Sequence, residues 1–239
     1  MSKKVVIIIT EGISDEFILK KFLEKRYTDT NIKFKVYGGD TFSDCYSTEP
    51  ILNTLGNCIT EIIELERFRP TDILAVFQLT DTDGCMIEDE NILVDKTQIL
   101  KTSYTLENIL VNDSPQKKNI IERNLLKKRN TNKMIKQQKV IKNRYIYQIY
   151  YFSRNIELVF FNDLNPIQED KTKNALRFSK NENSEPLKII SENMPPLSKI
   201  TYMDRYIESW DFIKEGTNSL KRNTNFSLLL EYLDSLILS

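Results

Sequence analysis

Histidine is absent from the 239 residues of this chain. Its absence excludes Ser-His and Cys-His catalysis and metal sites built on imidazole, so any chemistry has to use carboxylates, amines or hydroxyls. Cysteine is scarce, with three residues at Cys45, Cys58 and Cys85. No two of them form a CxxC pair, which argues against a zinc ribbon and a disulfide framework, and we expect reduced thiols.

Long apolar stretches are also missing. A membrane helix needs roughly 18 consecutive apolar residues, and the run at Val5–Ile9 is too short even for the core of a signal peptide. We therefore expect a cytoplasmic protein that does not enter a membrane. The formal net charge is zero, and 28% charged with 40% hydrophobic residues is ordinary for one large globular domain or a core domain with an appendage.

The first third of the chain alternates between β-branched runs and helical patterns. Continuous apolar runs predict strands buried on both faces, and apolar spacings of three and four predict the helices between them. In chain order, the predicted elements are a strand at Val5–Thr10, a helix ending near Lys25, a strand at Ile32–Tyr37, a helix at Ile51–Phe68 stopped by Pro70, and a strand at Ile73–Leu79. This β-α-β-α-β order favours an open parallel sheet that binds ligands beyond the carboxyl ends of its strands.

The remaining elements are less regular. Residues 86–143 predict an inserted, mainly helical and basic segment, after which Tyr145–Phe152 predicts a fourth strand. Asn155 to Phe161 predicts the next helix, and the polar, proline-containing residues 162–196 predict loop with some partial helix. Ser227–Leu238 predicts an apolar helix that packs on the sheet or on a partner chain.

These elements predict the α/β class and two parts of the chain. Residues 1–162 are expected to form a parallel sheet flanked by helices, with the insert at about 86–143. Residues 163–239 are expected to form a helical C-terminal extension packed on that core.

Acidic residues follow two of the predicted strands. Glu11 and Gly12 come directly after the first strand, and Asp81 and Asp83 come after the third. Carboxylate oxygens suit Mg²⁺, which keeps several waters and takes one or two carboxylates beside substrate phosphates. Alternate residues of an extended segment point to opposite sides, so both Asp side chains can face one ion only across a turn, which Gly84 makes feasible. Helix capping and surface solubility are the alternative explanation for isolated acids.

The same residues resemble a known family. IIITEGISDEFIL resembles the strand-then-EGxxD pattern of the Toprim fold, and LTDTDG, 70 residues later, resembles its strand-then-DxD pattern. SRNIELVFFN resembles the polar-then-FELW helix start of the RloB-like and OLD-like bacterial defence nucleases, to which the chain is most similar among Toprim proteins. The resemblance covers residues 4–84 and 145–162.

The resemblance implies a Toprim-like fold and a nuclease that uses Mg²⁺ or Mn²⁺, in antiphage defence or RNA processing. It assigns catalysis and metal binding to Glu11, Asp81 and Asp83, and Glu157 is the candidate for an additional ligand. Gly12, Gly84 and Asp15 are supporting residues, and Asp15 serves as a helix cap or holds Glu11. An ATPase partner subunit, as in defence systems, and a homodimer are further options that the sequence leaves open.

Other functions fit the motifs less completely. Haloacid-dehalogenase-like phosphatases and nucleotide-sugar transferases use a DxD, but neither explains Glu11 and Gly12. A topoisomerase needs a tyrosine-bearing gate domain, and a replicative primase usually brings a zinc module, so hydrolytic strand cleavage is favoured over religation. Two alternatives stay open: a small RNA-maturation nuclease with the same core, and a non-catalytic module that binds nucleic acid or senses an effector.

Residues 117–144 concentrate positive charge, with eight Lys and three Arg against the single acid Glu122. Such a segment suits a phosphate backbone, DNA or RNA, through salt-sensitive counterion release. A solvated helix face is the alternative. The candidate nucleic-acid contacts are Lys127, Lys128, Arg129, Lys133, Lys136 and Lys139.

Overall fold

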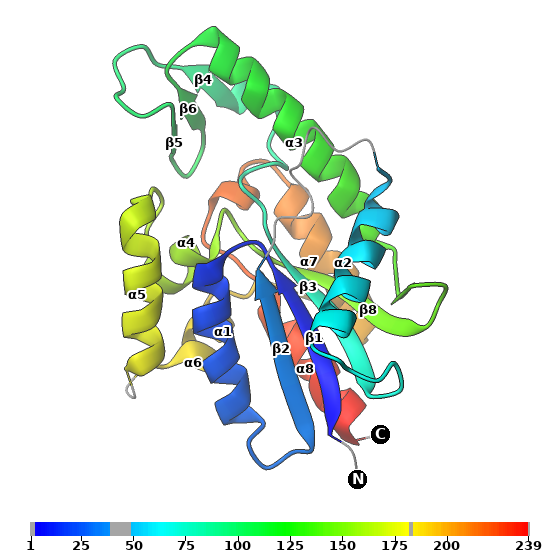
Figure 1. Ribbon diagram of the computed structural model, residues 1–239. Helices are drawn as coiled ribbons and strands as arrows, with labels where there is room; N and C mark the ends of the chain where they lie inside the picture. The colour runs from blue at the N-terminus through cyan, green and yellow to red at the C-terminus, as the bar shows by residue number, and fades with distance from the viewer. Residues whose placement is uncertain (1–2, 39–48, 182–183, 239) are drawn as a thin grey trace. The chain divides into compact units, whose positions relative to one another are not determined.

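The computed structural model describes residues 3–38, 49–181 and 184–238, with side chains except that of Ile13 (Figure 1). It has the predicted α/β class, with a five-stranded sheet, a three-stranded sheet and flanking helices. The strands are β1 Lys4–Thr10, β2 Ile32–Gly38, β3 Ile73–Asp81, β4 Ile92–Val94, β5 Thr102–Tyr104, β6 Ile109–Val111, β7 Lys139–Val140 and β8 Tyr145–Phe152. The helices are α1 Ile13–Arg26, α2 Ile51–Leu65, η1 Asp89–Asn91, α3 Ser114–Ile135, α4 Ile156–Phe161, α5 Gln168–Lys180, α6 Pro186–Glu192, α7 Tyr202–Lys214, η2 Asn218–Leu220 and α8 Phe226–Leu238.

The chain divides into two compact units, each built from three segments. The first unit comprises Met1–Thr80, Arg129–Ile149 and Gln168–Ser184, and the second comprises Asp81–Lys128, Tyr150–Ile167 and Glu185–Ser239. This division differs from the two consecutive parts, 1–162 and 163–239, that the sequence predicts. The difference arises because the chain passes from one unit to the other several times.

The larger sheet has the strand order β2-β1-β3-β8-β7. Strand β1 is parallel to both neighbours, with Ile7 opposite Lys35 of β2 and Val76 of β3. Residues Val6–Ile9 are fully buried, as expected for a strand covered on both faces. The β-α-β-α-β prediction is therefore confirmed. The sheet as a whole is mixed rather than parallel, because the short edge strand β7 pairs antiparallel with β8.

Helix ends follow local backbone chemistry. Helix α2 ends at Leu65, a few residues before the predicted Phe68, and Arg67 then adopts a left-handed φ of 54°. Helix α4 begins where predicted, because the Asn155 side chain accepts a hydrogen bond from the Leu158 N–H at 2.9 Å and caps it.

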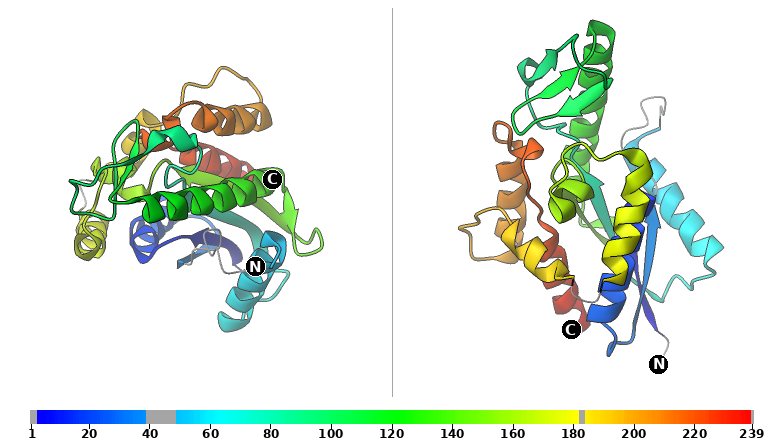
Figure 2. Two further views of the ribbon diagram at one scale, coloured as in Figure 1. Left: turned by 90° about the horizontal axis from the view of Figure 1, so that it is seen from above. Right: turned by 90° about the vertical axis from the view of Figure 1, so that its left-hand side faces the viewer.

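Residues 162–196 contain more helix than the predicted loop with some partial helix, because helices α5 and α6 occupy much of this segment. In the first unit, α5 packs along α1 with Ala175 fully buried (Figure 1, Figure 2). Pro186 is at the start of α6, where its missing N–H costs no helical hydrogen bond. Proline therefore marks a helix start here and not a break.

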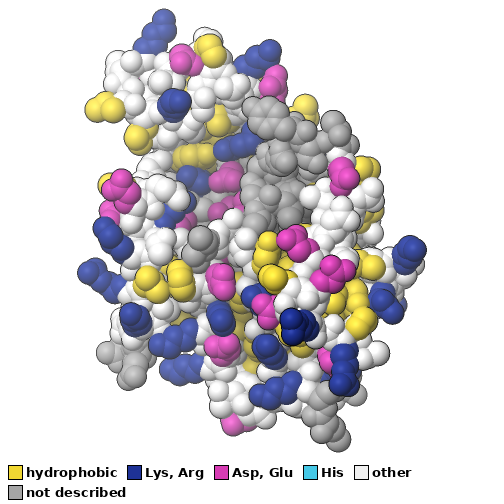
Figure 3. All heavy atoms as spheres, viewed as in Figure 1, with side chains coloured by type: hydrophobic (Ala, Val, Ile, Leu, Met, Phe, Trp, Pro, Cys, Tyr) yellow, Lys and Arg dark blue, Asp and Glu magenta, His cyan; other side chains and the backbone are white. Residues whose placement is uncertain are grey.

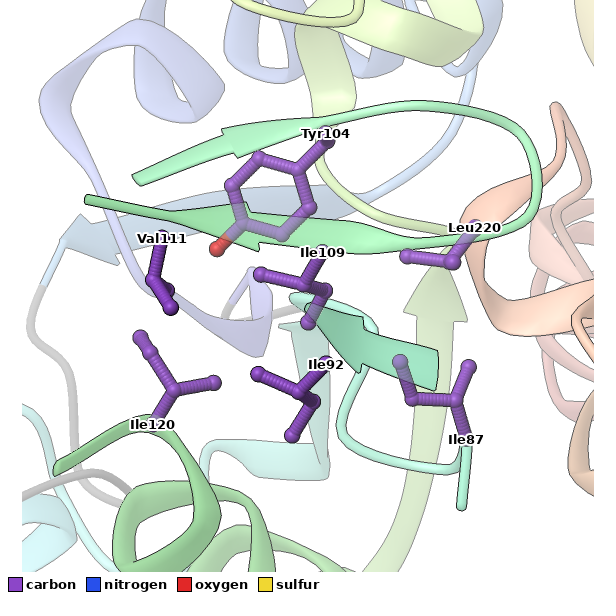
Figure 4. Packing of buried hydrophobic residues seen from close by; sticks show 7 residues of the cluster. All are labelled: Ile87, Ile92, Tyr104, Ile109, Val111, Ile120 and Leu220. Carbon is purple, nitrogen blue, oxygen red and sulfur yellow. The ribbon is translucent and has the colours of Figure 1, made fainter. Parts of the chain in front are cut away.

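The mainly helical prediction for residues 86–143 is also corrected. The segment contains the long helix α3, but it also contains a three-stranded sheet of order β4-β6-β5. Each strand has three residues, which are too few to show the alternation of apolar and polar residues that predicts a strand. Glu107 lies in the turn between β5 and β6 and not in a helix. A compact apolar cluster holds the small sheet to α3 and η2 (Figure 4), and its members are Ile87, Ile92, Tyr104, Ile109, Val111, Ile120 and Leu220.

The second unit has an aromatic core around its C-terminal helices. The ring of Tyr151 meets that of Trp210 of α7 edge to face, with centroids 4.9 Å apart. Helix α8 matches the predicted apolar helix and packs against α6 and α7. Among the described residues, no helix combines the length and apolarity needed to cross a membrane.

Candidate functional site

Glu11 of the first unit follows strand β1, and its side chain is held at the end of β3. The parallel register pairs Ile9 of β1 with Gln78 of β3, so both strands end at the same edge. The Thr80 hydroxyl donates a hydrogen bond to Glu11 Oε1 at 2.5 Å. Glu11 is therefore oriented by the residue directly before Asp81.

Gly12 and Asp15 shape the backbone that follows Glu11. The Gly12 N–H donates to Asp15 Oδ2 at 3.0 Å, and Asp15 is buried in the first turn of α1. This is the capping contact expected of Asp15, because its carboxylate satisfies an N–H at the start of the helix. The contact fixes the chain direction immediately after Glu11.

The DTDG segment forms a tight turn in the second unit. Asp83 and Gly84 have φ angles of 48° and 68°, so two successive residues are left-handed. The Thr82 and Asp83 N–H groups donate to the carbonyls of Phe152 and Arg154, both at 2.9 Å. Because a Cβ at position 84 would lie 2.5 Å from Leu220 Cδ2, the turn that the sequence predicts requires glycine there.

Asp83, itself half-buried, is the centre of an ion-pair network that includes the fully buried Lys127. Its Oδ2 is 2.7 Å from Lys127 Nζ and its Oδ1 is 2.9 Å from Arg154 Nη1, while Arg123 Nη2 donates to its carbonyl at 2.9 Å. Burial by itself raises the pKa of the Asp83 carboxyl, but Lys127, Arg123 and Arg154 outweigh burial and hold that pKa well below its usual range. Both carboxylate oxygens are thus engaged by cations of the chain itself.

These contacts bear on the predicted metal site. Within residues 3–38, 49–181 and 184–238, no three His, Cys, Asp or Glu side chains gather so that they could hold a metal ion. Asp81 is half-buried at the end of β3, and Glu157 is 3% exposed in the first turn of α4. Glu11 and Asp81 have the hard oxygens that Mg²⁺ prefers, but Asp83 is an ion-pair partner and not an open ligand. The set Glu11, Asp81, Asp83 and Glu157 therefore stays a prediction.

No protein-family model, curated protein or solved structure matches this chain. The resemblance to Toprim nucleases therefore depends on the two motifs at the strand ends and on the polar start of α4. The structure shows the α/β class and the parallel β1–β3 pair, and the Toprim-like fold stays a prediction.

The predicted nucleic-acid surface needs one correction. Lys127 is fully buried and pairs with Asp83, so it is not a surface lysine. The helical period explains why, because Lys127 shares the inward face of α3 with Ile120, Asn124 and Thr131. The remaining candidates are exposed or half-exposed: Lys128, which pairs with Glu88 at 3.5 Å, and Arg129, Lys133, Lys136 and Lys139. On the face shown in Figure 3, Lys and Arg side chains are interspersed with Asp and Glu.

Sequence reasoning missed Arg154 and Tyr104 as parts of this site. Arg154 Cζ lies 3.6 Å from the centroid of the Tyr104 ring, and the Tyr104 hydroxyl accepts from Arg123 Nη1 at 3.3 Å. Arg154 has a left-handed φ of 59°, a conformation that costs free energy in a non-glycine residue and is often found at functional sites. Arg154 is the second residue of the SRNIEL motif, and its place in that motif is the sequence feature that could have predicted its role in the site.

Proposed function

We propose that this chain is a nuclease that hydrolyses nucleic-acid phosphodiesters in a Mg²⁺- or Mn²⁺-dependent reaction. The observation that carries the proposal is the Thr80 hydrogen bond to Glu11, which ties the EG motif to the strand that ends in Asp81. Two acidic motifs at the ends of paired parallel strands are a simple source of hard oxygen ligands at a ligand-binding edge.

The proposed roles follow from the surroundings of each side chain. A divalent cation held by Asp81 and Glu11 would supply charge neutralisation at the phosphate and activation of water. Glu11, oriented by Thr80, is also suited to accept a proton from the attacking water. Asp83 instead anchors Lys127 and Arg154 and so keeps the DTDG turn in place.

The test is cleavage by the purified full chain of mixed single- and double-stranded DNA and RNA, with Mg²⁺ or Mn²⁺ and with chelator. Glu11→Gln is expected to lower the cleavage rate at least about a hundredfold, the usual contribution of a positioned acid-base group. Asp81→Asn is expected to lower the cleavage rate as well, because it removes a charged ligand of the cation. Glu24→Gln, at an exposed position of α1, is the matched control and should cleave like the parent chain. Chelator-resistant cleavage, or equal rates in Glu11→Gln and Glu24→Gln, would contradict the proposal.

A second candidate is the non-catalytic module that binds nucleic acid or senses an effector. It is favoured by the engagement of both Asp83 oxygens by Lys127 and Arg154, which gives the second acid of the DxD a structural role. Salt-sensitive binding of nucleic acid without cleavage of any substrate supports this module. Preference for RNA over DNA among cleaved substrates would instead favour the RNA-maturation variant of the nuclease.

A further inference from the structure

Arg123 of the second unit is a half-buried cation whose direct hydrogen-bond partners are neutral. Within the described residues, its guanidinium donates to the Tyr104 hydroxyl at 3.3 Å, the Asp83 carbonyl at 2.9 Å and Asn124 Oδ1 at 2.7 Å. Its charge thus has no direct carboxylate contact, although the Asp83 carboxylate is nearby. Buried charges are normally paired directly, because desolvation without an opposite charge is costly.

Two neighbouring side chains have hydrogen-bond donors to spare. Arg154 gives one Nη1 hydrogen bond to Asp83, while its buried Nε has no hydrogen-bond partner among the described residues. Asn124, 4% exposed, likewise has no partner for its Nδ2 within the part of the chain described here. Buried donors are rarely left unsatisfied, so this surplus indicates a ligand that brings acceptors.

The donors are held rigidly. Tyr104 belongs to the apolar cluster of Figure 4, which fixes the ring on which Arg154 stacks. The Arg154 N–H donates to the Ser219 carbonyl at 3.2 Å and to the Thr82 hydroxyl at 2.7 Å, which fixes its backbone. A preorganised guanidinium fork matches the oxygens of a phosphate better than a flexible lysine does.

We propose that Arg123, Arg154 and Asn124 form a binding site for a phosphate group. A phosphate offers acceptors for Arg154 Nε and Asn124 Nδ2, and it offers a direct negative charge for Arg123. Asp83 is the internal anion that holds Arg154 in position before the phosphate arrives. The phosphate site itself is independent of the proposed function. The inference that the phosphate belongs to a nucleic acid rests on the proposed function.

The experiment measures binding without cleavage. Isothermal titration of the full chain in chelator uses three probes: inorganic phosphate, a nucleoside 5′-monophosphate and a short single-stranded oligonucleotide. Arg123→Gln is expected to weaken binding about tenfold or more, because a hydrogen bond to a charged group is worth at least that much. Arg69→Gln removes the same charge from an exposed position and should bind like the parent chain.

Arg123→Lys provides a second variant that keeps the charge but loses the fork, and circular dichroism establishes that each variant is folded. Folded Arg123→Lys with weakened binding supports the site. If the parent chain binds inorganic phosphate and the monophosphate but not the oligonucleotide, and Arg123→Gln loses this binding, the phosphate site is supported. The same result contradicts nucleic acid as the source of the phosphate. Equal affinity of a folded Arg123 variant and Arg69→Gln for every probe, or no binding by the parent chain, overturns the proposal. Absence of cleavage with intact binding contradicts only the nuclease.

Discussion

Replacing the buried Lys127 by Met separates two interpretations of the basic helix. Lys127 is fully buried and 2.7 Å from Asp83, which is 22% exposed in its side chain and keeps a second partner, Arg154, at 2.9 Å. Removing one member of a fully buried ion pair costs about 3–5 kcal/mol. Because Asp83 is partly solvated and keeps Arg154, we expect Lys127→Met to lower the free energy of unfolding by about 2 kcal/mol.

Urea denaturation followed by circular dichroism measures this loss. With a slope of about 2–3 kcal/mol per molar urea, the midpoint is expected to fall by about 0.8 M with the slope unchanged. Lys136→Met, at an exposed position immediately after the same helix, is the control and should stay within about 0.5 kcal/mol of the parent chain. If Lys127→Met unfolds at the same urea concentration as Lys136→Met, the buried network is refuted and the surface role predicted from the sequence is restored.

Three further outcomes test other parts of the structure. Gly84→Ala places a Cβ against Leu220 at a residue with positive φ, and it should destabilise the chain by about 2 kcal/mol. Gly56→Ala is the control in helix α2, where open space surrounds the added Cβ, and it should stabilise the chain by about 0.5–1 kcal/mol. Similar midpoints of the two variants in thermal denaturation would refute the turn. Burial, aided by the neighbouring carboxylate of Glu61, raises the pKa of the Cys58 thiol to about 11, so about one thiol in a thousand is ionised at pH 8. Because the thiolate is the reactive form, the rate of Cys58 alkylation should rise up to about pH 11 without a plateau near pH 9. Peptide mass spectrometry measures this rate. Asn155→Ala removes the cap of α4 and should cost about 1 kcal/mol in chemical denaturation; an unchanged midpoint would argue against the cap.

Elements with strong local signals were predicted well. The strand predicted at Tyr145–Phe152 has those limits in the structure, and the run at Val5–Thr10 differs from β1 by one residue. Gly84 was expected at a turn, and its positive φ is what that turn needs. In each case the deciding interaction is contained in a few consecutive residues, such as a continuous apolar run or a backbone conformation that favours glycine.

Elements that depend on distant partners were missed. Strands β4, β5 and β6 have three residues each, and they exist because Ser103 pairs with Leu110 and because their apolar side chains join one cluster. Helix α5 has a polar sequence, and Ala175 is its buried residue, packed where the helix meets α1. Neither signal stands out in a short window of sequence.

The sequence by itself determined the α/β class, the order of the first five elements and the positions of Glu11 and Asp81 at strand ends, because these depend on local periodicity. Only the tertiary structure decided that Lys127 and Arg154, 44 and 71 residues from Asp83, close on its carboxylate. The physical reason is that the surroundings of a charged side chain decide which partner it binds. The same lysine contacts phosphate on a solvated helix face or neutralises an aspartate in the interior, and packing across the fold decides which.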